Sequence, residues 1–144
     1  MFKFGKSTDE LFTELKTEKN LDGWRSLNQK EFVEPLNEYL EKLLAEKNLS
    51  KQEVIERSGL NREYAYHILS GKRKNPSRQK VLALAIAIGL NLEETQYLLR
   101  YARHGALYPR NDWDAVIISA IEQKLSVMQT NELLHNLGET LLLE

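Results

Sequence analysis

Four polar side chains in the middle of the chain have the types and spacing needed to read the edges of DNA bases. They are Arg62, Glu63, Tyr66 and His67, and on a helix this spacing places them on one face. Arginine can pair bidentately with guanine, and glutamate can accept from the amino group of cytosine. His67 could donate to guanine or to a phosphate, and Tyr66 could contact a thymine methyl group or a phosphate. Asn61 directly precedes this face, where its side chain can either contact a base or cap the helix.

Basic and hydroxyl side chains on both sides of this face could bind phosphates. The candidates for phosphate contact are Ser50, Lys51, Lys72, Arg73, Lys74, Ser77 and Arg78, with Lys80 as a further flanking cation. Residues 50–80 hold 8 lysines and arginines against 3 acidic residues, whereas the whole chain has a net charge of −1. The middle of the chain would therefore attract a polyanion, with contacts that supply affinity and position rather than sequence choice.

Two short helices joined by a glycine turn would position these side chains. Ser50 and Glu53 have the form of a capping box, and Gly59 can adopt the left-handed conformation that ends a helix. Asn61 can cap the second helix, which should end at Gly71. Apolar residues on the other side of this helix are the expected buried anchors: Leu60, Ala65, Ile68 and Leu69. Such a layout can place the second helix in the major groove, N-terminus first.

The rest of the chain also shows helical patterns, so the predicted fold class is all-α. Apolar side chains at positions 36, 39, 40, 43 and 44 form the stripe of an amphipathic helix. Further helices are expected from Ser77, over 91–102, over 111–124 and over 126–137. The helix from Ser77 contains VLALAIAI and should be central to the core, because apolar residues surround most of it.

The segment resembles the xenobiotic-response-element (XRE) or Cro-type helix-turn-helix domain of phage repressors and bacterial regulators. The matching pieces are Leu49-Ser50, Glu53, Glu56-Arg57, Gly59, Asn61-Arg62, Ile68, Gly71-Lys72-Arg73, Asn75-Pro76-Ser77 and Leu82 through Leu90. The resemblance covers about residues 36–98 and implies a five-helix, phage-repressor-like DNA-binding domain. It also implies a two-fold dimer on a palindromic operator.

This chain departs from the family pattern at several positions. Lys51 stands where the family usually has glutamine, and Lys74 lengthens the basic loop by one residue. Ile55 replaces a usual alanine while Ala65 replaces a usual isoleucine on the facing helix, an exchange that conserves volume. Ser58 stands where leucine is common.

Three regions are expected along the chain. Residues 1–34 form an N-terminal helical extension, residues 35–103 form the helix-turn-helix domain, and residues 104–144 form a C-terminal helical extension. In the first region, a helix should begin at Ser7, and a short helix and a turn should follow. Leu11, Phe12 and Leu15 share one face of the first helix, and the candidate packing residues after it are Trp24, Leu27, Phe32 and Val33. The third region follows a loop at 104–110 and should pack its leucine-rich tail on the domain, with dimerisation or a protein partner as a second role.

No motif in the sequence indicates catalysis, a cofactor or a metal. There is no cysteine, the three histidines lack metal-ligand spacing, and phosphate loops, dinucleotide turns and nucleophile elbows are absent. The acidic pairs Glu93-Glu94 and Asp112/Asp114 lie in the first turns of predicted helices, where the helix dipole stabilises them. No apolar run approaches the ~20 residues that span a bilayer. We therefore expect a cytoplasmic protein that is not an enzyme and has no membrane partner.

The leading prediction is a sequence-specific DNA-binding transcriptional regulator in which the helix at about 61–70 reads the major groove. Its partners would be double-stranded DNA, with an operator expected to be palindromic, and a second copy of the chain. The alternative is a degenerate helix-turn-helix module that binds protein, as an antitoxin or adaptor does, without base-specific DNA binding. Tyr64, Tyr66 and Lys51 favour this alternative, together with the acidic flanks.

Overall fold

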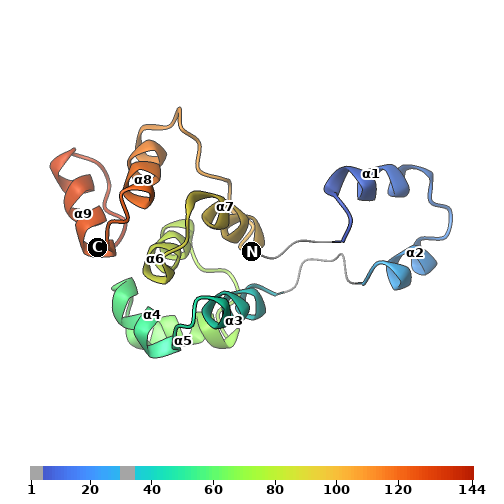
Figure 1. The fold of residues 1–144 in the computed structure, drawn as a ribbon, viewed down its shortest axis with the longest axis horizontal. Helices are drawn as coiled ribbons and strands as arrows, with labels where there is room; N and C mark the ends of the chain where they lie inside the picture. Colours follow the sequence, from blue (N-terminus) through green and yellow to red (C-terminus); the bar gives the residue numbers. More distant parts are fainter. Residues whose placement is uncertain (1–4, 30–34) are drawn as a thin grey trace. The chain divides into compact units, whose positions relative to one another are not determined.

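The computed structural model describes residues 5–29 and 35–144, and the regular structure within these residues is helical (Figure 1). The helices are α1 (Thr8–Thr17), α2 (Leu21–Leu27), α3 (Leu36–Glu46), α4 (Lys51–Ser58), α5 (Arg62–Ser70), α6 (Arg78–Ile88), α7 (Leu92–Tyr101), α8 (Asp112–Glu122) and α9 (Val127–Asn136). The predicted all-α fold class is confirmed. Two compact units, Met1–Glu34 and Pro35–Glu144, divide the chain and are described separately. Within the described ranges, no helix is both long enough and apolar enough to cross a membrane.

The first unit contains α1 and α2, joined through one buried aromatic side chain. Ser7 caps α1 by accepting a hydrogen bond from the Glu10 backbone N–H at 3.1 Å. Trp24 of α2 is buried, and its indole Nε1 donates to Glu14 Oε1 of α1 at 2.8 Å. This bond satisfies the polar atom that a buried tryptophan brings with it.

One apolar side chain that we expected to pack in this unit does not. Leu27 is 87 % exposed, so the expectation is wrong for this residue, and Phe12 and Leu15 on the shared face of α1 are exposed as well. The physical reason is that two helices of 10 and 7 residues offer too little facing surface to cover both stripes. Phe32 and Val33 lie outside the described residues.

The second unit is built around α6. Its buried residues occupy nearly the whole circumference: Val81, Leu82, Ala83, Leu84, Ala85, Ala87 and Ile88. Helices α4, α7 and α9 pack against it, as their arrangement around α6 in Figure 1 indicates. The predicted central position of this helix is therefore confirmed. The apolar stripe of α3 is buried as well: Leu36, Tyr39, Leu40, Leu43 and Leu44.

Two left-handed glycines end the helices that frame the predicted turn. Gly59, with φ 72°, follows α4, and Gly71, with φ 87°, follows α5. Between them, Asn61 caps α5 by accepting from the Tyr64 backbone N–H at 3.1 Å. The turn and both helix ends are thus formed as the local sequence predicts.

The C-terminal helices and the leucine-rich tail complete the same core. Five of their side chains join the buried cluster of the second unit, together with Leu107 of the loop before α8: Ile117, Ile121, Val127, Leu134 and Leu142. Asn131 of α9 holds the tail, since its Nδ2 donates to the Leu143 carbonyl and its Oδ1 accepts from the Leu142 N–H, each at 2.7 Å. The expectation that the tail packs is confirmed, and the loop at 104–110 lies inside the second unit rather than at its edge.

Candidate nucleic-acid interface

Helix α5 is buried on one face and exposed on the other. Ala65, Ile68 and Leu69 are buried, as predicted for the anchoring face. Arg62 and Glu63 are exposed, Tyr66 is 38 % exposed, and His67 is partly exposed. These four residues form the polar face that is predicted to contact bases. Helices α3 and α4 pack against α5, so the anchoring face fixes the direction in which the polar face points.

Two weak contacts order the polar face. The Arg62 guanidinium lies 5.8 Å from the centroid of the Tyr66 ring, within the range of a cation–π interaction. His67 Nε2 lies 3.9 Å from Glu63 Oε1, one helical turn earlier. These exposed contacts are worth less than about 1 kcal/mol each, so a bound base could displace them.

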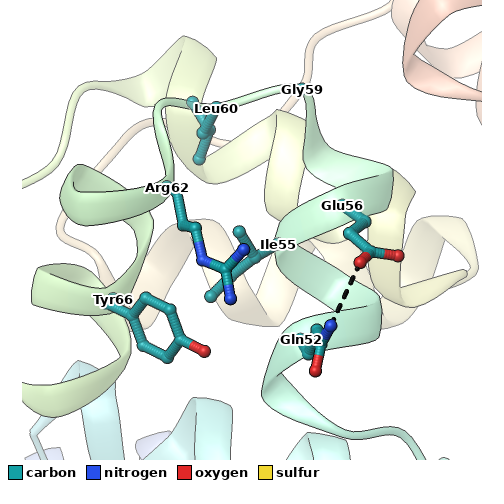
Figure 2. Close-up of a pocket in the computed structure, with 7 residues that line it drawn as sticks. All are labelled: Gln52, Ile55, Glu56, Gly59, Leu60, Arg62 and Tyr66. Atoms are coloured by element: carbon teal, nitrogen blue, oxygen red, sulfur yellow. Dashed lines mark hydrogen bonds between the residues drawn. The ribbon is translucent and has the colours of Figure 1, made fainter.

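A groove of about 220 Å³ runs between α4 and α5, and Arg62 reaches into it. Figure 2 shows the Arg62 guanidinium between the two helices, beside Ile55 and Tyr66. On the α4 side, Gln52 Nε2 donates to Glu56 Oε1 at 3.3 Å. The groove therefore places an amide, a carboxylate and a guanidinium within one small surface.

Gln52 and Glu56 were not among the residues predicted to contact DNA. Their spacing of four residues puts them on one face of α4, next to the cap at Ser50. The sequence alone does not show which side of α4 is buried, so it could not place Gln52 and Glu56 beside α5. In the structure, Val54 and Ile55 lie on the buried side of α4.

The larger residue on α4 and the smaller residue on α5 fit together, and neither is exposed. Ile55 of α4 and Ala65 of α5 are both buried. Ser58, which replaces a common leucine, is also buried, and its hydroxyl donates to the Ile55 carbonyl at 2.8 Å. The departures from the family pattern are therefore accommodated without an unsatisfied polar group among the described side chains.

Most of the predicted phosphate-contacting residues lie at the surface, but their polar atoms differ in availability. Lys51, Lys72 and Lys74 are exposed. The Ser50 hydroxyl accepts from the Glu53 N–H at 3.1 Å and donates to the Glu53 carboxylate at 3.2 Å. This bond replaces the capping-box bond in which the Ser50 backbone N–H would donate to the Glu53 carboxylate. Ser77 caps α6 by accepting from the Lys80 N–H, so the oxygen of each hydroxyl already caps its own helix.

The Tyr64 ring contacts two cations from different elements. The ring is half-buried against the core cluster, as expected for a packing residue. The Arg73 guanidinium of the basic loop lies 4.6 Å from its centroid, and Lys80 Nζ of α6 lies 4.0 Å from it. A hollow of about 440 Å³ opens beside this ring.

Arg78 is held inside the second unit instead of facing a ligand. Its Nη1 and Nη2 donate to the two Asp114 carboxylate oxygens at 2.9 Å each, and its Nε and Nη2 donate to the carbonyls of Gly105 and Ala106. Four of the five N–H groups of the guanidinium are thereby used. We therefore leave Arg78 out of the phosphate-binding set, contrary to the initial expectation.

Asp114 is the centre of this network, which joins α6 to the loop before α8. Burial raises the pKa of the Asp114 carboxyl, but hydrogen bonds from Arg78 and from the Tyr108 N–H outweigh burial, so the net pKa lies below its usual value. Nearby, His104 Nε2 lies 2.8 Å from the Pro76 carbonyl oxygen. A carbonyl only accepts, so this ring nitrogen carries the hydrogen. The helix dipole, which the sequence predicts to stabilise Asp114, is therefore only one of its contacts, beside the hydrogen bonds from Arg78 and Tyr108.

Comparison with protein families agrees with this geometry. Residues 40–94 match a family model described as helix-turn-helix, from within α3 to the first turn of α7. No curated protein and no solved structure matches the chain. The matched range contains the α4–Gly59–α5 unit, the basic loop and all of α6. Residues 40–94 of this chain are therefore similar to helix-turn-helix domains of the XRE type.

Proposed function

We propose that this chain is a sequence-specific DNA-binding transcriptional regulator whose helix α5 reads the major groove. The observation that carries the proposal is the division of α5 into two faces. Its apolar side is fully packed, while Arg62, Glu63, Tyr66 and His67 line the other side. A helix anchored in this way can enter a groove without disturbing the core.

In this proposal the residues have separate roles. Arg62 and Glu63 in the first turn, together with Tyr66 and His67 one turn later, contact bases. Asn61 gives its oxygen to the helix cap, and its amide group is left to contact DNA. The exposed cations Lys51, Lys72, Arg73 and Lys74 neutralise phosphates, and backbone N–H groups at the starts of α4 and α6 assist them.

We further propose that the chain binds a palindromic operator as a homodimer. Selection from a random duplex library tests the sequence preference and the two-fold symmetry together. A palindromic winner with half-sites about 10 base pairs apart is expected for two copies side by side. Enrichment of no sequence, with no binding to any duplex at low salt, would favour the alternative module that binds protein.

Substitution of Arg62 tests the proposed orientation. Arg62→Ala should weaken binding to the selected operator by about 1–3 kcal/mol and relax the preference at one base pair. Lys72→Ala should weaken all sequences similarly, because a phosphate contact carries no base information. Arg110→Ala, in the exposed loop outside the matched segment, removes the same charge and serves as the control. Unchanged affinity and preference in Arg62→Ala would show that α5 does not enter the groove as proposed.

A further inference from the structure

The two cations at Tyr64 form a surface that the helix-turn-helix pattern does not predict. Arg73 comes from the loop after α5, and Lys80 from the first turn of α6. Both charged groups lie within cation–π distance of the same ring. The ring is thus a shared platform that brings together charges seven residues apart in sequence.

The platform is fixed on both sides. The Arg73 backbone N–H donates to the His67 carbonyl at 2.8 Å, which ties the loop to the end of α5. Lys80 stands in the first turn of α6, where its backbone N–H donates to the Ser77 hydroxyl. The backbone of each cation is therefore held before any ligand arrives, which lowers the entropic cost of binding.

The arrangement leaves a local excess of positive charge. Within the described residues, neither Arg73 nor Lys80 has a carboxylate within ion-pair distance. The acidic residue that lines the hollow is Glu63, whose side chain is 82 % exposed and whose carboxylate lies 3.9 Å from His67 Nε2. Arg73 and Lys80 line the same hollow, so their like charges repel each other, and an anion bound in the hollow would relieve that repulsion.

The hollow has the donors that a phosphate group needs. Asn61, His67, Arg73 and Lys80 all line it, and they offer amide, imidazole, guanidinium and ammonium groups. Charge-assisted bonds from a guanidinium and an ammonium are among the stronger contacts to phosphate oxygens. The volume of about 440 Å³, open to solvent, leaves room for a phosphate that belongs to a polymer.

We propose that the Tyr64 hollow, defined by Asn61, Tyr64, His67, Arg73 and Lys80, is a preformed site for one backbone phosphate of DNA. Tyr64 is the positioning residue, because its ring contacts both of the cations that line the hollow. This inference rests on the proposed function. It assigns Arg73, already among the proposed phosphate contacts, and Lys80 to one fixed site on the side of α5 away from the α4 groove, so this site would set the register of α5 along the DNA strand.

The salt dependence of DNA binding by the full chain tests the site. Lys80→Gln and Arg73→Gln should each reduce the slope of log K against log salt, together by about 0.9, the value for one phosphate. Affinity at 0.1 M salt should then fall roughly tenfold on every duplex sequence. Lys124→Gln, in the turn between α8 and α9, makes the same charge change elsewhere and should leave the slope unchanged.

Two substitutions of Tyr64 separate positioning from charge. Tyr64→Phe keeps the aromatic ring and should keep both affinity and slope. Tyr64→Leu keeps an apolar side chain but removes the ring, and should weaken binding several-fold at low salt. Thermal melting of each variant without DNA distinguishes this effect from loss of folding. Equal weakening by Tyr64→Phe and Tyr64→Leu would overturn the role of the ring.

Inorganic phosphate, titrated at constant ionic strength, distinguishes a DNA phosphate from a free phosphorylated molecule. Phosphate binding that Lys80→Gln abolishes and that competes with DNA supports the assignment, whereas phosphate binding that leaves the affinity for DNA unchanged would overturn it. If the native chain binds DNA and the cation variants keep its salt slope, the hollow is not a phosphate site and the proposed function stands. If the native chain binds no duplex at low salt, the proposed function fails, and the inference fails with it.

Discussion

Replacing Asp114 by asparagine should destabilise the second unit by about 2–3 kcal/mol. The substitution keeps the shape of the side chain but removes the charge that receives two hydrogen bonds from Arg78 and one from the Tyr108 N–H. Buried hydrogen bonds to a charged group contribute about 1.5–3 kcal/mol each. The Asp114 side chain is 8 % exposed but that of Arg78 is 28 % exposed, so water replaces part of the loss.

Thermal and urea unfolding of the full chain measure this effect. For a unit of this size, 2–3 kcal/mol corresponds to a fall in Tm of roughly 10 °C. Asp112→Asn is the matched control, because Asp112 lies in the same first turn of α8 and is exposed. It should lose only the helix-dipole contribution, about 0.3–1 kcal/mol. Equal melting temperatures for the two variants would refute the assignment of the stability to the Arg78 pair.

The pH dependence gives an independent check on the same carboxylate. The folded-state pKa of Asp114 is lowered, so its contribution is complete above the unfolded-state pKa of about 3.9 and is lost as pH falls through the lower, folded-state pKa. The difference in unfolding free energy between the native chain and Asp114→Asn should be constant from pH 7 to about pH 5. It should shrink below about pH 4. A difference that grows in acid would contradict the sign of the shift.

Two further comparisons probe the turn and the tail by urea unfolding. Gly71→Ala should lower the free energy of unfolding more than Gly89→Ala. Both glycines have left-handed backbones, in which an alanine is strained by about 1–2 kcal/mol. A Cβ at Gly71 would lie 2.8 Å from Asn37 Cγ, while no atom lies within 4 Å of a Cβ at Gly89. Equal losses of unfolding free energy in the two variants would mean that the Asn37 side chain moves aside freely. Leu142→Ala should cost about 2–4 kcal/mol because Leu142 is 2 % exposed, whereas Leu137→Ala, at a 57 % exposed position, should cost little. Similar losses in both leucine variants would contradict the packing of the tail.

Local signals predicted the helices because capping and turn formation depend on neighbours in sequence. Ser50, Asn61, Ser77 and the left-handed Gly59 act within three or four residues, and each forms in the structure. The polar face of α5 followed from the helical period in the same way. That these side chains contact DNA remains a prediction.

The contacts that the sequence did not predict connect distant residues. Arg78 and Asp114 are 36 positions apart, and nothing local distinguishes Arg78 from the other cations of the basic segment. Tyr64 likewise acquires Arg73 and Lys80 only after the loop folds back on α5. In the first unit, Phe12 and Leu27 have helical spacing but lack the facing surface that would bury them.

Helix α6 is buried around nearly its whole circumference, which limits how this domain could be transferred between proteins by recombination. The family match ends at residue 94, yet α9 packs on α6, and Val127, Leu134 and Leu142 belong to the same apolar cluster. A recombination event that moved only the matched segment would carry α6 away from part of its cover and expose it to aggregation. The helix-turn-helix and the helices after it should therefore be inherited together, as one evolutionary unit.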